Sequence, residues 1–322
     1  MREKGHRAEG TGDRAAAVIF AVLALALGLA GQAAPLQKAV ALAPTTIYLG
    51  PDTTSTKVGA VRPGMDFGIQ SHTGDFAQVF VGAVGVSGWI PNHGYALLDD
   101  AGAAEAVFGA AVGLENQAEE TGGERQAALN AANLYMSVYS DFPASARAAE
   151  ALYRAASIRW QLKLAEEPRR PTPSERQFPD DSGLHRVINK FGKTPWAARA
   201  EYDLLVEHFT CGVWVEKPQC VEKEIHTYQG YVKKYPGGPK TAEAAYDALY
   251  RAGIAWTLYR APGAHQDAGK AAQYQRQVAD DAATLARLYP ATDWAAQAAL
   301  IAFNVAHNTP LTVPGHTPMG GP

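Results

Sequence analysis

One short pattern occurs four times in the second half of this chain, and it restricts the possible folds more than any other feature. Each copy has an aromatic residue, then a Pro or Gly, then small or hydroxyl residues, with further Ala or Tyr residues at helical spacing. The copies begin at Phe142, Phe191, Tyr235 and Tyr289. An aromatic residue at the end of one helix, a helix breaker and the start of a second helix together describe the corner of a helical hairpin. Four corners predict an α-helical repeat array over residues 124–308.

The hydroxyl residues of the pattern support this interpretation. Ser145, Thr194 and Thr292 stand where a side-chain oxygen can accept from the first free amides of the second helix. Pro195 fits the first helical position, which needs no amide hydrogen. We therefore expect each of these residues to mark a helix start.

Residues 43–99 have a different character, with β-branched and aromatic residues in short bursts separated by Gly, Pro and Asp. Such bursts predict strands joined by turns. We expect strands near residues 45–49, 66–71, 76–81, 88–91 and 95–98. Five short strands in so small a segment predict a closed or nearly closed barrel, which hides strand edges.

Both segments resemble known families. The turn and strand motifs at residues 48–52, 59–64, 74–79 and 88–90 resemble the bacterial Src-homology-3 family, which usually has Trp where this chain has Phe76. Residues 124–307 resemble the tetratricopeptide-type repeats of periplasmic proteins, as in outer-membrane assembly lipoproteins of the BamD kind and cell-division coordinator proteins. The markers are 49, 44 and 54 residues apart, more than the ~34 residues of a plain tetratricopeptide repeat. The resemblance implies a multidomain chain: a small all-β Src-homology-3-like barrel plus an all-α tetratricopeptide-like helical repeat array.

The N-terminal segment indicates export. Four basic residues precede an apolar run over residues 15–30, and small residues follow it at 31–34. This order is typical of a secretory signal peptide, predicted here as residues 1–33, and it places the protein in the periplasm or outside the cell. The alternative is an uncleaved anchor, but the run is shorter than the ~20 residues of a spanning helix. After cleavage we expect no transmembrane segment.

Three further expectations concern the remaining segments. The two cysteines, Cys211 and Cys220, lie close together, and in an exported chain such a pair predicts a disulfide, with two buried thiols as the alternative. Residues 100–123 are rich in Ala, Gly and Glu and predict a partly helical linker. The Pro- and Gly-rich residues 309–322 predict a disordered tail.

The candidate ligand-binding residues lie in the predicted barrel. Trp89, Pro91, Asn92 and Tyr95 follow one another closely, and Phe76 lies in the preceding strand. Aromatic rings beside a Pro suit an extended peptide or a glycan strand. The alternative interpretation is that Trp89 and Tyr95 close the core of a small barrel.

Composition and motifs limit the function. The net charge of −3, without a long basic block, argues against nucleic-acid binding. No catalytic or metal-binding motif is recognisable, so we expect neither an enzyme nor a cofactor. The predicted function is an envelope interaction scaffold: the repeats bind a periplasmic or secreted protein partner, and the barrel is a candidate for binding peptide or peptidoglycan. The alternative is a cell-wall-targeting or regulatory subunit of an envelope enzyme.

Overall fold

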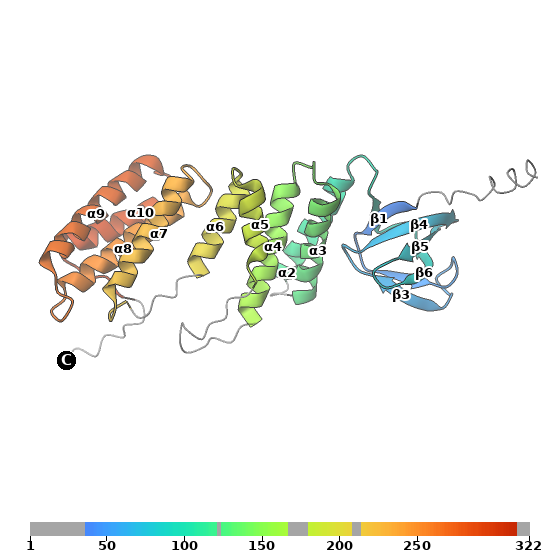
Figure 1. Cartoon of the computed structure of the whole chain (residues 1–322), viewed down its shortest axis with the longest axis horizontal. Helices are drawn as coiled ribbons and strands as arrows, with labels where there is room; N and C mark the ends of the chain where they lie inside the picture. Colours follow the sequence, from blue (N-terminus) through green and yellow to red (C-terminus); the bar gives the residue numbers. More distant parts are fainter. Residues whose placement is uncertain (1–35, 121–123, 167–179, 208–213, 314–322) are drawn as a thin grey trace, which may run out of the picture.

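The computed structural model describes residues 36–120, 124–166, 180–207 and 214–313. Within these residues the chain has two parts, an antiparallel β-sheet followed by a row of helices (Figure 1). The predicted division into a β part and a helical part is therefore confirmed. The predicted signal peptide, residues 1–33, lies outside the described residues.

The β part is a seven-stranded antiparallel sheet with the strand order β3-β2-β6-β5-β4-β1-β7. Its ladders leave β3 and β7 as the two edge strands, so the hydrogen-bonded sheet is open where a closed or nearly closed barrel was expected. The strands are β1 (Gln37–Ala41), β2 (Thr45–Tyr48), β3 (Lys57–Val61), β4 (Asp66–Thr73), β5 (Phe76–Val81), β6 (Val86–Pro91) and β7 (Tyr95–Leu97).

Two of these strands were not expected from the sequence. β1 begins before the predicted domain boundary at residue 43, and β3 contains Gly59 and Ala60 in its middle. Small residues give a weak strand signal, since they fill little of a pleated surface. Their pairing with β4, β7 and β2 decides their conformation.

One face of the sheet curls around a single apolar core. On β5, Ala77, Val79 and Val81 are fully buried, and they alternate with residues on the opposite face. Every strand contributes to this cluster, whose buried members are Ala39, Ala41, Ile47, Val61, Phe67, Ile69, Ala77, Val79, Val81 and Ile90, with Tyr95 and Leu97 packed against them. The two edge strands therefore share one core although no ladder joins them in the described sheet.

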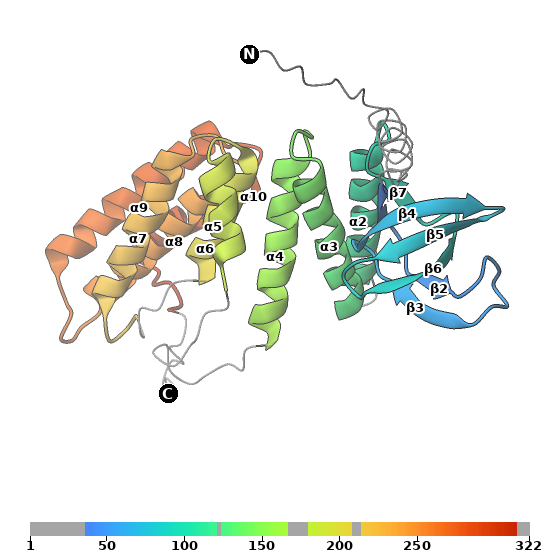
Figure 2. The same cartoon turned by 45° about the vertical axis from the view of Figure 1, so that its right-hand side comes forward.

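The helical part consists of antiparallel helices in a row (Figures 1 and 2). They are α2 (Ala103–Glu120), α3 (Arg125–Asp141), α4 (Ala148–Glu166), α5 (Ser182–Phe191), α6 (Pro195–Glu207), α7 (Pro218–Lys234), α8 (Thr241–Arg260), α9 (Ala268–Leu288) and α10 (Asp293–Ala306). α4 contacts α3, α5 and α6, and α8 contacts α7, α9 and α10 in the same way. The second helix of a hairpin thus packs on its own first helix and on both helices of the next hairpin.

The four predicted corners are confirmed by one repeated hydrogen bond. In each corner the backbone N–H three residues after the marker donates to the carbonyl oxygen of the aromatic residue, at 2.8–3.1 Å; the pairs are Ser145 to Phe142, Thr194 to Phe191, Gly238 to Tyr235 and Thr292 to Tyr289. The predicted caps are present as well. The amides of Arg147, Ala197 and Ala295 donate to the hydroxyl oxygens of Ser145, Thr194 and Thr292, at 3.1, 3.4 and 3.3 Å.

The segment predicted as a linker is instead largely the helix α2. Val107, Phe108 and Ala111 are buried, and they pack with Leu134 and Tyr135 of α3 in one cluster. Gly109 and Gly113 weaken the local helix signal. Burial against α3 outweighs this weak propensity, so residues 103–120 belong to the helical array.

The sheet packs directly on the first helices. Val40 of β1 is fully buried within the cluster that α2, α3 and α4 form. The turn before β4 approaches α3 so closely that a Cβ on Gly64 would lie 2.8 Å from the backbone of Asn133. Gly64 also has a φ of 79°, so this position requires glycine for two reasons.

The start of the predicted disordered tail is ordered. The N–H of Leu311 donates to the hydroxyl of Thr257 on α8 at 3.1 Å, and Val313 is buried in the cluster of α7 to α10. The prediction is therefore wrong for residues 309–313, because two apolar side chains in a short segment suffice to fix it on the array. Residues 314–322 lie outside the described residues. None of the described helices has the length and hydropathy that a membrane crossing requires.

Candidate functional site

Three of the predicted binding residues come together on the outer face of the sheet. Phe76 of β5 pairs with Pro91 of β6, and Gln78 pairs with Trp89. Trp89 also pairs with Tyr48 of β2, whose ring meets the Phe76 ring edge to face at 6.3 Å. We call Tyr48, Phe76, Trp89 and Pro91 the aromatic strip. All four are partly exposed.

The strip is not required to fill the core of the sheet. Its members alternate along β5 and β6 with Ala77, Val79 and Ile90, which are at most 1% exposed. These inward residues supply the apolar contacts of the core. The aromatic rings on the other face are therefore available for a ligand.

Tyr95 lies on the other side of the sheet. Its ring contacts Phe67 edge to face at 5.6 Å and packs against the core cluster. Burial raises the pKa of its hydroxyl. The predicted group of binding residues is thus divided: Trp89 faces outward, and Tyr95 has the core position that the alternative interpretation gave to both.

Asn92 fixes one end of the strip. Its backbone N–H donates to the carbonyl of Asp75 at 2.8 Å, and its side-chain amide donates to the carbonyl of Gly74 at 3.0 Å. Its Oδ1 lies 3.1 Å from Nδ1 of His72. These contacts hold the turn before Phe76 against the end of β6. Asn92 therefore positions Phe76 and Pro91 side by side, although its own side chain is exposed.

A second concave site lies on the helical array. A cavity of about 410 Å³ opens between four helices and is lined by Trp160, Gln161, Leu164, Tyr202, Asp203, Tyr228, Glu243, Asp247 and Arg251. Two of its walls carry the same contact. Tyr153 donates to Asp203 at 2.9 Å, and Tyr202 donates to Asp247 at 2.7 Å. Tyr153 and Tyr202 stand at the same distance from the aromatic markers Phe142 and Phe191, so the contact is repeated along the array.

The charged side chains around this cavity make contacts within the array. Burial raises the pKa of the Asp203 and Asp247 carboxyls. Arg251 places its Nε 2.7 Å from a carboxylate oxygen of Glu224 and its Nη1 3.4 Å from Asp247. The same guanidinium lies over the Tyr228 ring, 4.4 Å from its centroid. These groups bind neighbouring helices together, so we assign them a structural role.

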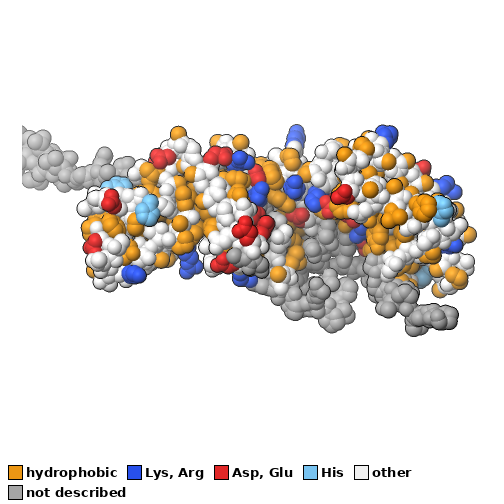
Figure 3. Space-filling view, turned by 180° about the vertical axis from the view of Figure 1, so that it is seen from behind, with side chains coloured by type: hydrophobic (Ala, Val, Ile, Leu, Met, Phe, Trp, Pro, Cys, Tyr) orange, Lys and Arg blue, Asp and Glu red, His pale blue; other side chains and the backbone are white. Residues whose placement is uncertain are grey.

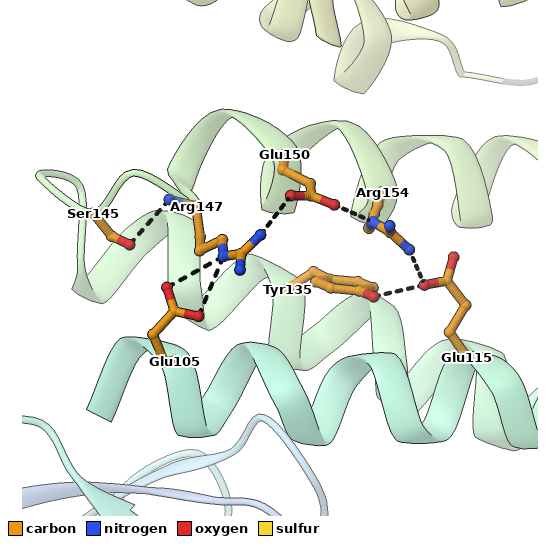
Figure 4. A network of polar contacts seen from close by, with 7 residues as sticks. All are labelled: Glu105, Glu115, Tyr135, Ser145, Arg147, Glu150 and Arg154. Carbon is orange, nitrogen blue, oxygen red and sulfur yellow. Dashed lines mark hydrogen bonds and ion pairs between the residues drawn. The ribbon is translucent and has the colours of Figure 1, made fainter. Parts of the chain in front are cut away.

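Another charged network joins α2 to α4 and to the residue before it (Figure 4). Arg147, directly before α4, contacts Glu105 of α2 and Glu150 of α4, each at 3.2 Å. Arg154 contacts Glu150 at 2.9 Å and Glu115 of α2 at 2.7 Å. Glu115 also accepts a hydrogen bond from the buried Tyr135 at 2.6 Å. The sequence indicated neither network, because the contacts that join different helices connect residues far apart along the chain.

The predicted disulfide stays a prediction. Cys220 lies in the first turn of α7 and is 7% exposed. Cys211 lies outside the described residues. Among the described residues, no group of three or more His, Cys, Asp or Glu side chains is arranged to hold a metal ion.

Comparison with known protein families and with curated proteins gives no significant match to this sequence.

Proposed function

We propose that the protein is an exported scaffold of the cell envelope, with a Src-homology-3-like β domain that binds an extended ligand and tetratricopeptide-like repeats that bind a protein partner. The observation that supports it best is the aromatic strip. Its rings lie side by side on one face, are partly exposed, and are separated from the core by strand alternation.

The chemistry of the strip favours a peptide or a glycan strand of peptidoglycan as ligand. Aromatic rings offer flat faces for apolar contact, and Pro91 extends this surface next to Phe76. Gln78 lies beside Trp89 on the same face, and its side-chain amide can bind the polar groups of an extended chain. Partly exposed aromatic rings beside such a polar group are typical of surfaces that bind extended ligands.

The helical array supports the second part of the proposal. Its hairpins share one corner geometry and pack in the same order, so together they form an extended surface. Repeat arrays of this construction bind proteins along such surfaces. The cavity between α4, α6, α7 and α8 is one recess on this surface.

The test is co-sedimentation of the full chain with purified peptidoglycan, repeated with Trp89→Ala and Phe76→Ala. We expect each substitution to reduce binding by about tenfold or more, as the loss of a central aromatic contact does, while the melting temperature changes little. The control is Val84→Ala, which removes an exposed apolar side chain of the same sheet, 52% exposed in the turn after β5.

Tyr95→Ala serves as the opposite control. It removes a ring that packs on Phe67 in the core, so it should lower the melting temperature while binding persists below the unfolding transition. Unchanged binding by Trp89→Ala and Phe76→Ala would refute the assignment of the strip. The ligand would then have to bind elsewhere on the chain.

A further inference from the structure

The last described helix, α10, leaves an apolar face uncovered. Ala296, Ala299, Leu300 and Phe303 lie on one side of the helix together with His307, and all five are exposed. Leu300 is 60% exposed and Phe303 is 57% exposed. Asp293, in the first turn, is the one charged residue of α10. From behind, hydrophobic side chains gather over the end of the molecule that α7 to α10 form (Figure 3).

Comparison of α10 with α4, which follows an equivalent corner, indicates the role of this face. Phe142 and Tyr289 end α3 and α9 in the same backbone conformation, with φ and ψ of −125° and 57° and of −133° and 48°. Counted from these two aromatic residues, Ala299 and Phe303 of α10 and His307 directly after it occupy the positions of three buried residues of α4. These are Leu152, Ala156 and Trp160, which are 1%, 8% and 3% exposed.

In α4 these positions form the contact with the next hairpin. Leu152, Ala156 and Trp160 belong to one cluster with Leu184 and Val187 of α5. Ala156 lies so close to α5 that a Cβ on Gly183 would approach it to 3.0 Å. The opposite faces of α4 and α10 are also equivalent, since Ala151 and Ala298 are each fully buried against their own hairpin. α10 therefore presents an inter-helix contact surface, whereas a terminal repeat normally has a polar outer face.

The sizes of the exposed residues indicate which helix fits there. Ala296 and Ala299 lie toward the start of α10, and Leu300 and Phe303 lie toward its end. We propose that α10 pairs antiparallel with α10 of a second copy of this chain, about a two-fold axis between Ala299 and Leu300. The large Phe303 then lies opposite the small Ala296 of the second copy, and Leu300 lies opposite Ala299.

This pairing satisfies the requirements of an interface between identical chains. In an isologous contact the same surface must be complementary to itself, and the gradient from small to large side chains provides this. An antiparallel pair also keeps the two Asp293 carboxylates at opposite ends of the contact. One helix pair buries little surface, so the dimer dissociates on dilution.

The experiment measures the molar mass of the full chain, exported and purified from the envelope fraction so that any processing of its N-terminal segment has occurred. Sedimentation equilibrium between about 1 μM and about 1 mM covers the range in which small interfaces dissociate. We expect a reversible monomer–dimer equilibrium. Phe303→Glu should shift its dissociation constant at least tenfold toward monomer, and the helical circular dichroism should stay unchanged because Phe303 is exposed. The control Leu49→Glu changes an equally exposed side chain of the sheet, 65% exposed, and should leave the equilibrium as it is.

A second pair of variants tests the orientation. Ala296→Lys alone should weaken the dimer, whereas Ala296→Lys together with Phe303→Glu should restore part of it, because each new Lys then faces a Glu of the second copy. A monomer at every concentration would overturn the proposal. A dimer that is insensitive to Phe303→Glu would overturn it as well, and a double variant weaker than both single variants would exclude the antiparallel arrangement.

Discussion

The ion pair between Arg251 and Glu224 allows a quantitative test of how the array is held together. It joins α8 to α7, with 2.7 Å between Nε and the carboxylate oxygen, and the two side chains are 13% and 3% exposed. Arg251→Met keeps the length of the side chain but leaves the Glu224 carboxylate buried without its cationic partner, although the indole N–H of Trp214 still donates to it at 3.0 Å. Removal of one partner of a buried pair costs about 3–5 kcal/mol. We expect about 3 kcal/mol here, because Arg251 retains some contact with solvent.

The assay is urea unfolding followed by helical circular dichroism, with Glu224→Gln as the matched partner variant. The glutamine side chain is uncharged and can still accept the Trp214 hydrogen bond, so the double variant should recover about 2 kcal/mol of the loss. A double-mutant cycle then gives the coupling between the two residues. If the losses of unfolding free energy in the two single variants simply add in the double variant, the reasoning is refuted. Additive losses would show that Arg251 does not stabilise the Glu224 carboxylate.

Two further predictions concern a cap and a buried carboxyl. Thr194→Ala should lower the free energy of unfolding by about 1 kcal/mol through loss of the cap on α6. The control Lys193→Ala, at an exposed neighbouring position, should change this free energy little. Equal effects of the two substitutions in denaturant melts would show that the cap is unimportant. Burial raises the pKa of Asp281 on α9, so its protonated form stabilises the fold below the unfolded-state pKa, and this contribution is lost as the pH rises through the folded-state value. Asp281→Asn should therefore raise the melting temperature at neutral pH, and this increase should disappear in acid. An increase in melting temperature that is the same at neutral and acid pH would contradict the assignment.

Local chemistry decides which parts of the fold could be predicted from the sequence. The corners at Phe142, Phe191, Tyr235 and Tyr289 were predictable because a helix breaker acts within a few residues. In three of the four a capping hydroxyl adds to this signal. The helix α2 and the strand β1 were not, because their Ala-rich segments adopt a structure only when they pack on α3 and pair with β4. Secondary structure that depends on distant partners leaves a weak signal in the sequence.

The candidate site shows the same limit. The sequence placed Phe76, Trp89 and Pro91 close together, and the structure brings them onto one face. The sequence could not show on which face of the sheet Tyr95 lies. The face depends on the alternation of residues along a strand, and the bend between β6 and β7 interrupts this alternation. Tyr48 completes the strip from β2, and only the pairing of β2 with β6 reveals it. The tyrosine–aspartate contacts of the array likewise depend on the packing of hairpins.

The central claim, that the aromatic strip binds an extended envelope ligand, is tested most directly by nuclear magnetic resonance. The full chain is titrated with soluble peptidoglycan fragments, and the indole N–H signals are assigned by Trp→Phe substitution. We predict that the Trp89 signal shifts in proportion to saturation, whereas the signal of the buried Trp256, 2% exposed on α8, does not move. A Trp89 signal that stays in place while the fragments bind, or shifts confined to the helical array, would contradict the account.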